Sequence, residues 1–372
     1  MKIQPQNALL GLSLQELTGI AETLGQPSYR GRQLFQAIYA QRRNLLSQIT
    51  TLPQELRKSL VEQGFSLALP KIEKQFTSTD GTIRYLFAFP DAQSVETVWM
   101  PEGDDGEAGD GSEADPQGAS WQAGKFHRAT ICVSSQVGCA VDCHFCMTAL
   151  LGLQRNLTAG EIVGQVLAVL SERDVDVPSE RINLVFMGQG EPFLNYDNFM
   201  KAVRLLSDPA GVGIPLSRMT VSTSGIVPRI YDFGKEEHRP KLAISLNASD
   251  DETRTRLMPI NKKWDLEKLI AAARQFPLRP RERLTFEYVL LDGVNDGEKN
   301  ALEVAELLRG LRAKVNLIAL NPGPDIPFST PADGSVHQFQ KILVEAGIPA
   351  YIRRPRGLDI YAACGQLKRT VA

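Results

Sequence analysis

Three cysteines stand close together in the sequence, Cys139, Cys143 and Cys146, with the spacing C-x3-C-x2-C. Three thiolates on one short loop can hold three corners of a cubic iron–sulfur cluster and leave the fourth iron open to a small molecule. A structural zinc site usually brings four protein ligands, and the nearest further candidate, His144, lies inside the same loop, where reaching the same ion would be strained. The spacing therefore favours an open iron–sulfur cluster, with a zinc site and three unligated cysteines as the alternatives.

Short polar motifs follow the apolar segments downstream of the cysteine loop. The first, G-Q-G-E-P at 188–192, has glycines that permit close approach of a ligand, and Glu191 could bind an ammonium group. Three later apolar segments end at Ser222, at Ser245-Leu246-Asn247 and at Asn321. Taken singly, each motif is more typical of a turn or a helix cap. They become candidates for ligand binding only if the fold gathers them at one edge.

The elements that must position these groups begin near residue 129, where apolar runs alternate with amphipathic helices. The expected strands are 129–134, 182–187, 219–223, 242–246, 284–290 and 315–320, and the expected helices are 159–172, 196–206, 266–275, 299–308 and 337–346. Apolar runs without alternation indicate strands buried on both faces, as in parallel sheets. Six strand–helix units predict an α/β fold with an open partial (β/α)6 barrel, because a closed barrel of eight units needs about 250 residues. Reactive groups should then lie at the carboxyl ends of the strands.

The region before the barrel divides into two parts. Residues 1–75 predict a small helical accessory domain with helices at 14–24, 29–39 and 53–62, the first opened by a capping box at Ser13 and Glu16. Its first 74 residues contain nine basic and five acidic side chains, which suits a polyanion such as RNA, with a solvated helical surface as the alternative. Residues 76–127 hold two expected strands, 83–89 and 95–100, and an acidic insertion at 102–124 that we expect to be disordered. The barrel then occupies residues 128–372.

The composition excludes several classes of protein. The chain has 372 residues, of which 43% are hydrophobic and 23% charged, as in an ordinary globular protein. No apolar run approaches the roughly 18 residues of a membrane span, and the first residues do not form a secretory signal. Five cysteines are too few for a disulfide scaffold. We therefore expect a cytoplasmic protein without membrane contact.

The cysteine loop, with Phe145 before its last cysteine, resembles the radical S-adenosylmethionine (SAM) superfamily. More of the chain resembles one family within it, the dual-specificity 23S rRNA and tRNA adenine-C2 methyltransferases of the RlmN type. The matching segments are 26–34, 128–152, 186–195, 221–228, 243–247, 259–263, 286–295, 316–322 and 353–367. The resemblance implies a 4Fe–4S cluster on the three loop cysteines, with SAM bound at its open iron. The acidic insertion departs from the family pattern without touching these motifs.

The resemblance also implies a role for each site residue. Cys364 would carry the methyl group, Cys132 would resolve the intermediate through a transient disulfide with Cys364, and Glu96 would accept a proton. Without the resemblance, both cysteines would be taken as small buried thiols and Glu96 as a solvent-facing strand residue. The implied SAM-binding residues are Gly190, Glu191, Ser222, Ser245, Leu246, Asn247 and Asn321. Asn247 stands where some members of the family have His.

The implied partners are 23S rRNA, tRNA and a low-potential electron donor such as flavodoxin or ferredoxin, and we expect a monomer. Two other functions stay open on the sequence. One is methylation of adenine at C8 by a Cfr-type enzyme, which shares the chemical parts. The other is a zinc-stabilised RNA-binding protein without catalysis.

Overall fold

The computed structural model describes residues 7–102 and 128–368, so the acidic insertion predicted at 102–124 lies outside the described residues beyond Glu102. Ten strands form one sheet in the order β1-β2-β3-β4-β7-β8-β9-β10-β11-β12. The strands from β4 onward are parallel to one another, and the first three are antiparallel. Within the described ranges, no ladder joins β1 to β12, so the barrel is open, as predicted.

The parallel strands match the predicted apolar runs within about two residues, and the structure adds a seventh. They are β4 (Arg128–Cys132), β7 (Arg181–Phe186), β8 (Met219–Thr223), β9 (Lys241–Ser245), β10 (Leu284–Leu290), β11 (Ala313–Ala319) and β12 (Ala350–Ile352). The unpredicted β12 has only three residues, too few for a periodic signal. It pairs with β11 through Val315 and Ala350.

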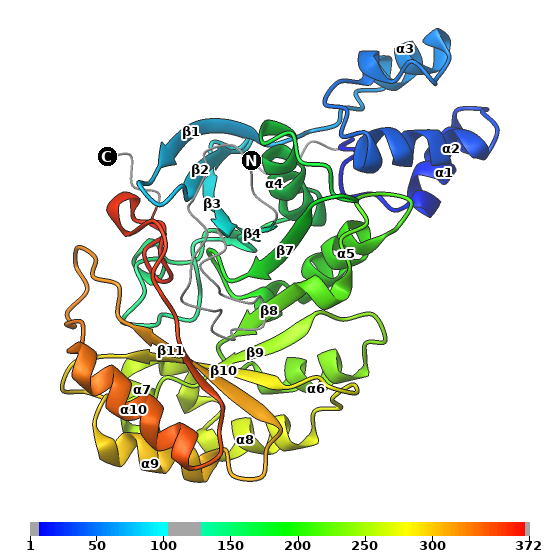
Figure 1. Cartoon of the computed structure of the whole chain (residues 1–372). Helices are drawn as coiled ribbons and strands as arrows, with labels where there is room; N and C mark the ends of the chain where they lie inside the picture. Colours follow the sequence, from blue (N-terminus) through cyan, green and yellow to red (C-terminus); the bar gives the residue numbers. More distant parts are fainter. Residues whose placement is uncertain (1–6, 103–127, 369–372) are drawn as a thin grey trace.

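Helices surround the outside of the parallel strands (Figure 1). They are α4 (Ala159–Glu172), α5 (Tyr196–Ser207), α6 (Val227–Lys235), α7 (Asp251–Leu257), α8 (Leu266–Gln275), α9 (Glu298–Leu307) and α10 (Asp333–Glu345). The sequence predicted all of these except α6 and α7. The capping box at Thr158 and Glu161 that opens α4 is present in the structure.

Three antiparallel strands extend the barrel sheet: β1 (Lys71–Thr77), β2 (Ile83–Ala88) and β3 (Ser94–Glu102). The sequence predicted β2 and β3 but not β1, in which only Ile72 and Phe76 are half-buried among exposed polar residues. Exposed lysines on an edge strand discourage pairing with other chains. The boundary expected at residue 75 therefore falls inside a strand of the barrel sheet.

The amino-terminal region is helical, as its sequence predicted. It contains α1 (Leu14–Thr23), α2 (Tyr29–Phe35), which continues into a π-helical turn at Gln36–Ala40, and α3 (Gln54–Glu62). Gly11 lies against Gly160 of α4, where an added Cβ would come within 2.5 Å of the Gly160 nitrogen. The helices thus share one continuous apolar core with the barrel.

Residues 353–368 form a segment that we call the C-terminal strap. It leaves β12 and crosses the barrel to the turn between β1 and β2 (Figure 1). There the Asp359 carboxylate accepts a hydrogen bond of 2.5 Å from the Ser78 hydroxyl, and Asp80 accepts one of 3.0 Å from the Gly357 nitrogen. The strap therefore connects the two edges of the open sheet. Among the described residues, no helix is long and apolar enough to cross a membrane.

Candidate active site

A cavity of about 170 Å³ lies at the carboxyl ends of the parallel strands. Loops from β4, β7, β8, β9, β10 and β11 meet there, together with the strap. Ten of the thirteen predicted site residues line this cavity: Cys139, Cys143, Cys146, Gly190, Glu191, Ser222, Ser245, Asn247, Asn321 and Cys364. Leu246, Glu96 and Cys132 are not among its lining residues. The fold thus gathers motifs that are up to 225 positions apart in the sequence.

The cysteine loop is held at its base by the two-stranded ladder of β5 (Gln136–Val137) and β6 (Arg155–Asn156). At Gly138 the backbone has φ +77°, and an added Cβ would collide with the Gly152 carbonyl oxygen. The Cys139 nitrogen donates a hydrogen bond to the same carbonyl at 3.2 Å. Only glycine fits at position 138, which fixes where the three thiols emerge.

The electrostatics of the loop suit a positively charged group. Withdrawal from water raises the pKa of all three thiols, that of Cys139 to about 12, and for Cys143 mutual repulsion with the other two thiols adds to the effect. Thiolates form here only when cations compensate them, as iron does.

The arrangement of the thiols bears on the kind of metal group. In the described part of the chain, no three His, Cys, Asp or Glu residues converge on a single ion. A cubic cluster does not require this, because each cysteine binds a different iron. Three half-buried cysteines on one loop, lining one cavity, therefore fit a 4Fe–4S cluster.

The turn after β7 brings Glu191 into the cavity. Gly190 has φ +98°, and an added Cβ would come within 2.5 Å of Gln136. The Glu191 carboxylate is buried and accepts hydrogen bonds from the Ser224 nitrogen at 2.6 Å and the Phe193 nitrogen at 2.9 Å. Burial nevertheless raises its pKa. A buried carboxylate at this position would be stabilised further by an ammonium group in the cavity.

The other polar candidates line the rim at successive strand ends. The hydroxyl oxygens of Ser222 and Ser245 lie 3.4 Å apart. The Asn247 side chain accepts a hydrogen bond of 2.8 Å from the Val289 nitrogen. The Asn321 amide donates one of 3.0 Å to the carbonyl of Cys364, so Asn321 already links the rim to the strap. Leu246 is fully buried below the rim, so only its backbone can shape the cavity.

The two remaining cysteines lie on facing elements. Cys364 is exposed on the strap and lines the cavity, whereas Cys132 is buried on β4. Cys132 packs with Val98 of β3 and with Ala362 and Leu367 of the strap. Burial raises the pKa of Cys132, and the nearby Cys364 raises it further. Both are free thiols here, and they are close enough to interact electrostatically.

Glu96 is not the solvent-facing strand residue that the sequence suggests without the resemblance. Its side chain is fully buried on β3 and forms an ion pair of 2.6 Å with the buried Arg84 of β2. The Gln189 amide donates a weak hydrogen bond of 3.4 Å to the same carboxylate. Gln189 precedes two cavity residues, so Glu96 lies behind the cavity wall. Its role as proton acceptor stays a prediction.

Sequence reasoning missed Arg254, a fully buried arginine of α7. Its guanidinium donates to the carbonyl oxygens of Ser224, Ser245 and Leu246 at 2.9 to 3.0 Å, which ties the ends of β8 and β9 together. Burial lowers its pKa to about 10. In the sequence nothing distinguishes it from Arg256, two residues later, which is exposed.

Fold and site together define the class of protein. The radical SAM superfamily pattern matches residues 133–305. A crystal structure of a radical SAM methyltransferase from Sphaerobacter thermophilus has a TM-score of 0.87 and 43% identity, over 97% of this chain and 99% of that one. The protein is a radical SAM enzyme, and its cofactors are a 4Fe–4S cluster and SAM.

Two curated relatives narrow this class. The chain is 70% identical, over 94% of its length and 98% of the relative, to a probable dual-specificity RNA methyltransferase RlmN of Koribacter versatilis. It is 42% identical, over 95% of its length and 96% of the relative, to the dual-specificity RNA methyltransferase RlmN of Syntrophobacter fumaroxidans. The chain belongs to the RlmN family of dual-specificity RNA methyltransferases.

Proposed function

We propose that the protein methylates C2 of adenosine in 23S rRNA and tRNA through a methyl group carried on Cys364. The observation that carries this proposal is the pair of thiols beyond the cysteine loop. Cys364 faces the cavity and Cys132 lies behind the strap that bears it. A single nucleophilic thiol would suffice to accept a methyl group. The second one gives a way to release the product.

Adenine C2 is an electron-poor carbon that cannot attack a methyl donor as a nitrogen or oxygen nucleophile does. When bound, the cluster and SAM supply an electrophilic methyl group and the radical that activates it. The Cys364 thiolate attacks that methyl group, so a sulfur–carbon bond forms. Glu191, Ser222, Ser245 and Asn321 orient the donor at the rim.

The later steps return the enzyme to its starting covalent state. Once the SAM-derived radical has taken a hydrogen atom from the Cys364-bound methyl group, its carbon joins C2. A base then removes the C2 proton, and we assign this role to Glu96. The Cys132 sulfur then attacks the Cys364 sulfur, which breaks the bond from sulfur to the transferred carbon and leaves a disulfide. The released carbon takes up a proton to become the methyl group, and the one unpaired electron left by the radical addition would return to the cluster. Two electrons and two protons from a cellular reductant restore the thiols. The raised pKa of Cys132 keeps it a thiol, and therefore unreactive, until this step.

Two cysteine variants test the proposal. Cys364→Ala should lose the methyl acceptor and all methylation. Cys132→Ala should still accept the methyl group and attack the base, so that enzyme covalently joined to RNA accumulates. Gel analysis and mass spectrometry detect the conjugate. Normal turnover by Cys132→Ala, with no conjugate, would show that the release step is wrongly assigned.

The position of the methyl group tests the nearest alternative. Mass spectrometry of the modified nucleoside against authentic standards should identify 2-methyladenosine, whereas a Cfr-type enzyme would give 8-methyladenosine. Anaerobic reconstitution with iron and sulfide separates either enzyme from a zinc-stabilised RNA-binding protein. Loss of bound iron on replacing all three loop cysteines by alanine is the expected result.

The partners and the location belong to the same proposal. We assign RNA binding to the helical region within residues 1–75, electron delivery to a flavodoxin or ferredoxin, and a monomeric state in the cytoplasm. Support for the first comes from Arg32, Arg43 and Lys58, which are exposed on the amino-terminal helices and the loop after them. Arg30, Arg42 and Arg57 instead donate hydrogen bonds to backbone carbonyl groups.

A further inference from the structure

A second, larger cavity of about 720 Å³ lies at the opposite end of the barrel, at the amino-terminal ends of the parallel strands. Lys241 opens β9, Thr285 is the second residue of β10 and Lys314 the second of β11. Its size falls in the range of small-molecule sites, roughly 300 to 1,000 Å³. The wall between the two cavities includes Met187 and Glu287, which line both.

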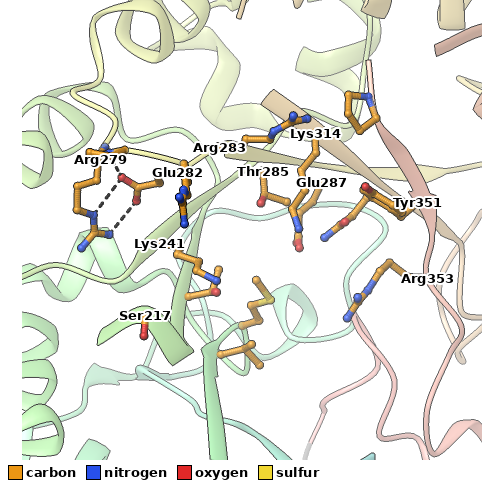
Figure 2. Close-up of a pocket in the computed structure, with 17 residues that line it drawn as sticks. Ser217, Lys241, Arg279, Glu282, Arg283, Thr285, Glu287, Lys314, Tyr351 and Arg353 are labelled. Carbon is orange, nitrogen blue, oxygen red and sulfur yellow. Dashed lines mark hydrogen bonds and ion pairs between the residues drawn. The ribbon is translucent and has the colours of Figure 1, made fainter. Parts of the chain in front are cut away.

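The lining is strongly cationic. Six basic side chains contribute to it: Lys241, Arg279, Arg281, Arg283, Lys314 and Arg353. In Figure 2, Lys241 and Arg353 reach toward each other from separate walls. The acidic lining residues are only Glu282 and Glu287. The cavity therefore has a surplus of positive charge.

The two carboxylates offset only part of this surplus. Glu282 is held by Arg279 at 2.8 Å (Figure 2) and by Arg239, outside the cavity, also at 2.8 Å. Burial opposes its ionisation, but these hydrogen bonds outweigh burial and lower its pKa to about 2. Burial raises the pKa of Glu287, while the nearby Arg353 and Lys314 favour its charged form, so Glu287 offsets part of the charge of these two residues. Lys241, Arg283 and the other basic residues thus face a cavity that favours anions.

An unsatisfied polar atom also points to a ligand. Asn316 of β11 lines the cavity and is only 8% exposed, yet its Oδ1 atom has no hydrogen-bond partner. A buried acceptor without a partner destabilises the fold, so such atoms commonly meet a bound group or water. An acceptor suits the amino or hydroxyl groups of an organic molecule rather than a bare phosphate.

The aromatic ring of Tyr351 is a further feature of the cavity that suits a nucleobase. It lines the cavity, is half-buried, and lies beneath the Lys314 ammonium, 5.7 Å from the ring centre. Aromatic rings and arginine planes stack on nucleobases, and arginine and lysine bind phosphates. We propose that this cavity binds a nucleoside polyphosphate, with its phosphates near Lys241 and Arg283 and its base near Tyr351 and Asn316. The site adjoins the SAM cavity, since Met187 and Glu287 line both.

Direct binding measurements test this without turnover, so their failure and a failure of the methyltransferase proposal are distinguishable. The cluster-loaded full chain is titrated anaerobically with ATP at saturating SAM, so that the upper cavity is filled. We expect one saturable site, from which inorganic tripolyphosphate displaces ATP. The double variant Lys241→Gln/Arg283→Gln should bind ATP at least tenfold more weakly.

The control removes the same charge elsewhere. Lys299→Gln/Lys341→Gln changes two exposed lysines on α9 and α10 and should bind ATP within twofold of the wild type. Thermal unfolding checks that the variants fold. If the first double variant unfolds, the single change Arg283→Gln, at an exposed residue, takes its place.

Two results would overturn the proposal. One is the absence of saturable ATP binding, or ATP binding that the cavity variant leaves unchanged. The other is displacement of ATP by an RNA stem-loop as readily as by tripolyphosphate, with the RNA also losing tenfold affinity in the cavity variant. That result would make the cavity part of the RNA-binding surface.

Discussion

The buried ion pair between Arg84 and Glu96 fixes the Glu96 carboxylate behind the wall of the SAM cavity. Both side chains are fully buried, and their separation is 2.6 Å. Removing one partner of such a pair is costly because the other charge remains without compensation. Glu96 therefore has a structural role in addition to the proposed chemical one, and an experiment must separate the two.

The change Glu96→Gln provides that separation. If Glu96 accepts the C2 proton, methylation of Cys364 should persist while release of methylated RNA slows by about 10² to 10⁴, the usual contribution of a general base. Quench-flow with radiolabelled SAM measures both steps. Equal losses in both steps, in proportion to lost stability, would mean that the ion pair only supports the fold.

Arg254 should contribute strongly to stability. Arg254→Met removes the donor to three carbonyl groups at the ends of β8 and β9. Each buried acceptor left unsatisfied costs about 1 to 3 kcal/mol, so we expect the free energy of unfolding to fall by about 3 kcal/mol or more. Urea denaturation measures this.

The exposed neighbour Arg256 is the matched control for that substitution. Arg256→Met changes the same helix at a surface position and should alter stability by less than about 0.5 kcal/mol. A similar small effect of Arg254→Met would show that water replaces its hydrogen bonds.

At the scale of elements, the C-terminal strap places Cys364. The strap is tied to the cysteine loop, since the Met147 nitrogen donates to the Gly365 carbonyl at 2.8 Å and the Thr148 hydroxyl to that of Leu367 at 2.8 Å. Its other end is tied to the β1–β2 turn by Asp80 and Asp359. The position of the Cys364 thiol, the proposed methyl acceptor, therefore depends on contacts at both ends of the strap.

Weakening the attachment to the β1–β2 turn should loosen the strap. In Asp80→Asn, amide hydrogen exchange in residues 357–364 should speed up about tenfold, as expected if the change costs about 1.4 kcal/mol. Asp292→Asn, at an exposed aspartate elsewhere, should leave this exchange unchanged. Equal exchange in both variants would mean that the contact with Gly357 does not hold the strap.

The same contact predicts a pH dependence. Burial opposes ionisation of Asp80, but hydrogen bonds from Gly357 and Thr82 outweigh it and lower the pKa. A lowered pKa in the folded state means that the stabilisation is present above about pH 3.9, the unfolded value, and is lost as the pH falls through the lower folded value. The protection factors of residues 357–364 in the apo-protein, which correct exchange for its intrinsic rate at each pH, should therefore fall below about pH 4.

The sequence predicted the elements whose signals are local. The six longer barrel strands, the capped helix α4 and the cysteine spacing each lie within a short stretch of chain. Features that depend on distant partners were missed: β12 exists because it pairs with β11, and the strap follows its path because of Ser78 and Asp80. Arg254 was missed for the same reason, because its partners lie on two other strands.

At the scale of the whole molecule, the amino-terminal helices and the barrel share a core, so deleting the helices would expose apolar surface. A gentler test replaces Arg32, Arg43 and Lys58 together by glutamine. RNA affinity should fall, and the slope of log affinity against log salt should become shallower by about 2 to 3, since each lost phosphate contact contributes about 0.7 to 0.9. Fluorescence anisotropy at several salt concentrations measures it.

A triple replacement on the outer helices serves as the control. Lys299, Lys341 and Arg309 are exposed and lie on or beside α9 and α10. Their replacement by glutamine should leave the salt slope unchanged. The same shift in both triple variants would mean that RNA responds to net charge and not to the amino-terminal helices.

The strap also sets an order of events during synthesis. The hydrogen bond between Ser78 and Asp359 joins residues 281 positions apart. At about 5 to 20 residues per second, a ribosome needs about 15 to 55 seconds to add that length of chain. Cys364 follows the last loop cysteine, Cys146, by 218 residues, which takes about 11 to 44 seconds at the same rate. For that time the nascent chain has its proposed cluster ligands but lacks the thiol proposed to receive the methyl group, so methyl transfer through Cys364 cannot begin before the strap is made.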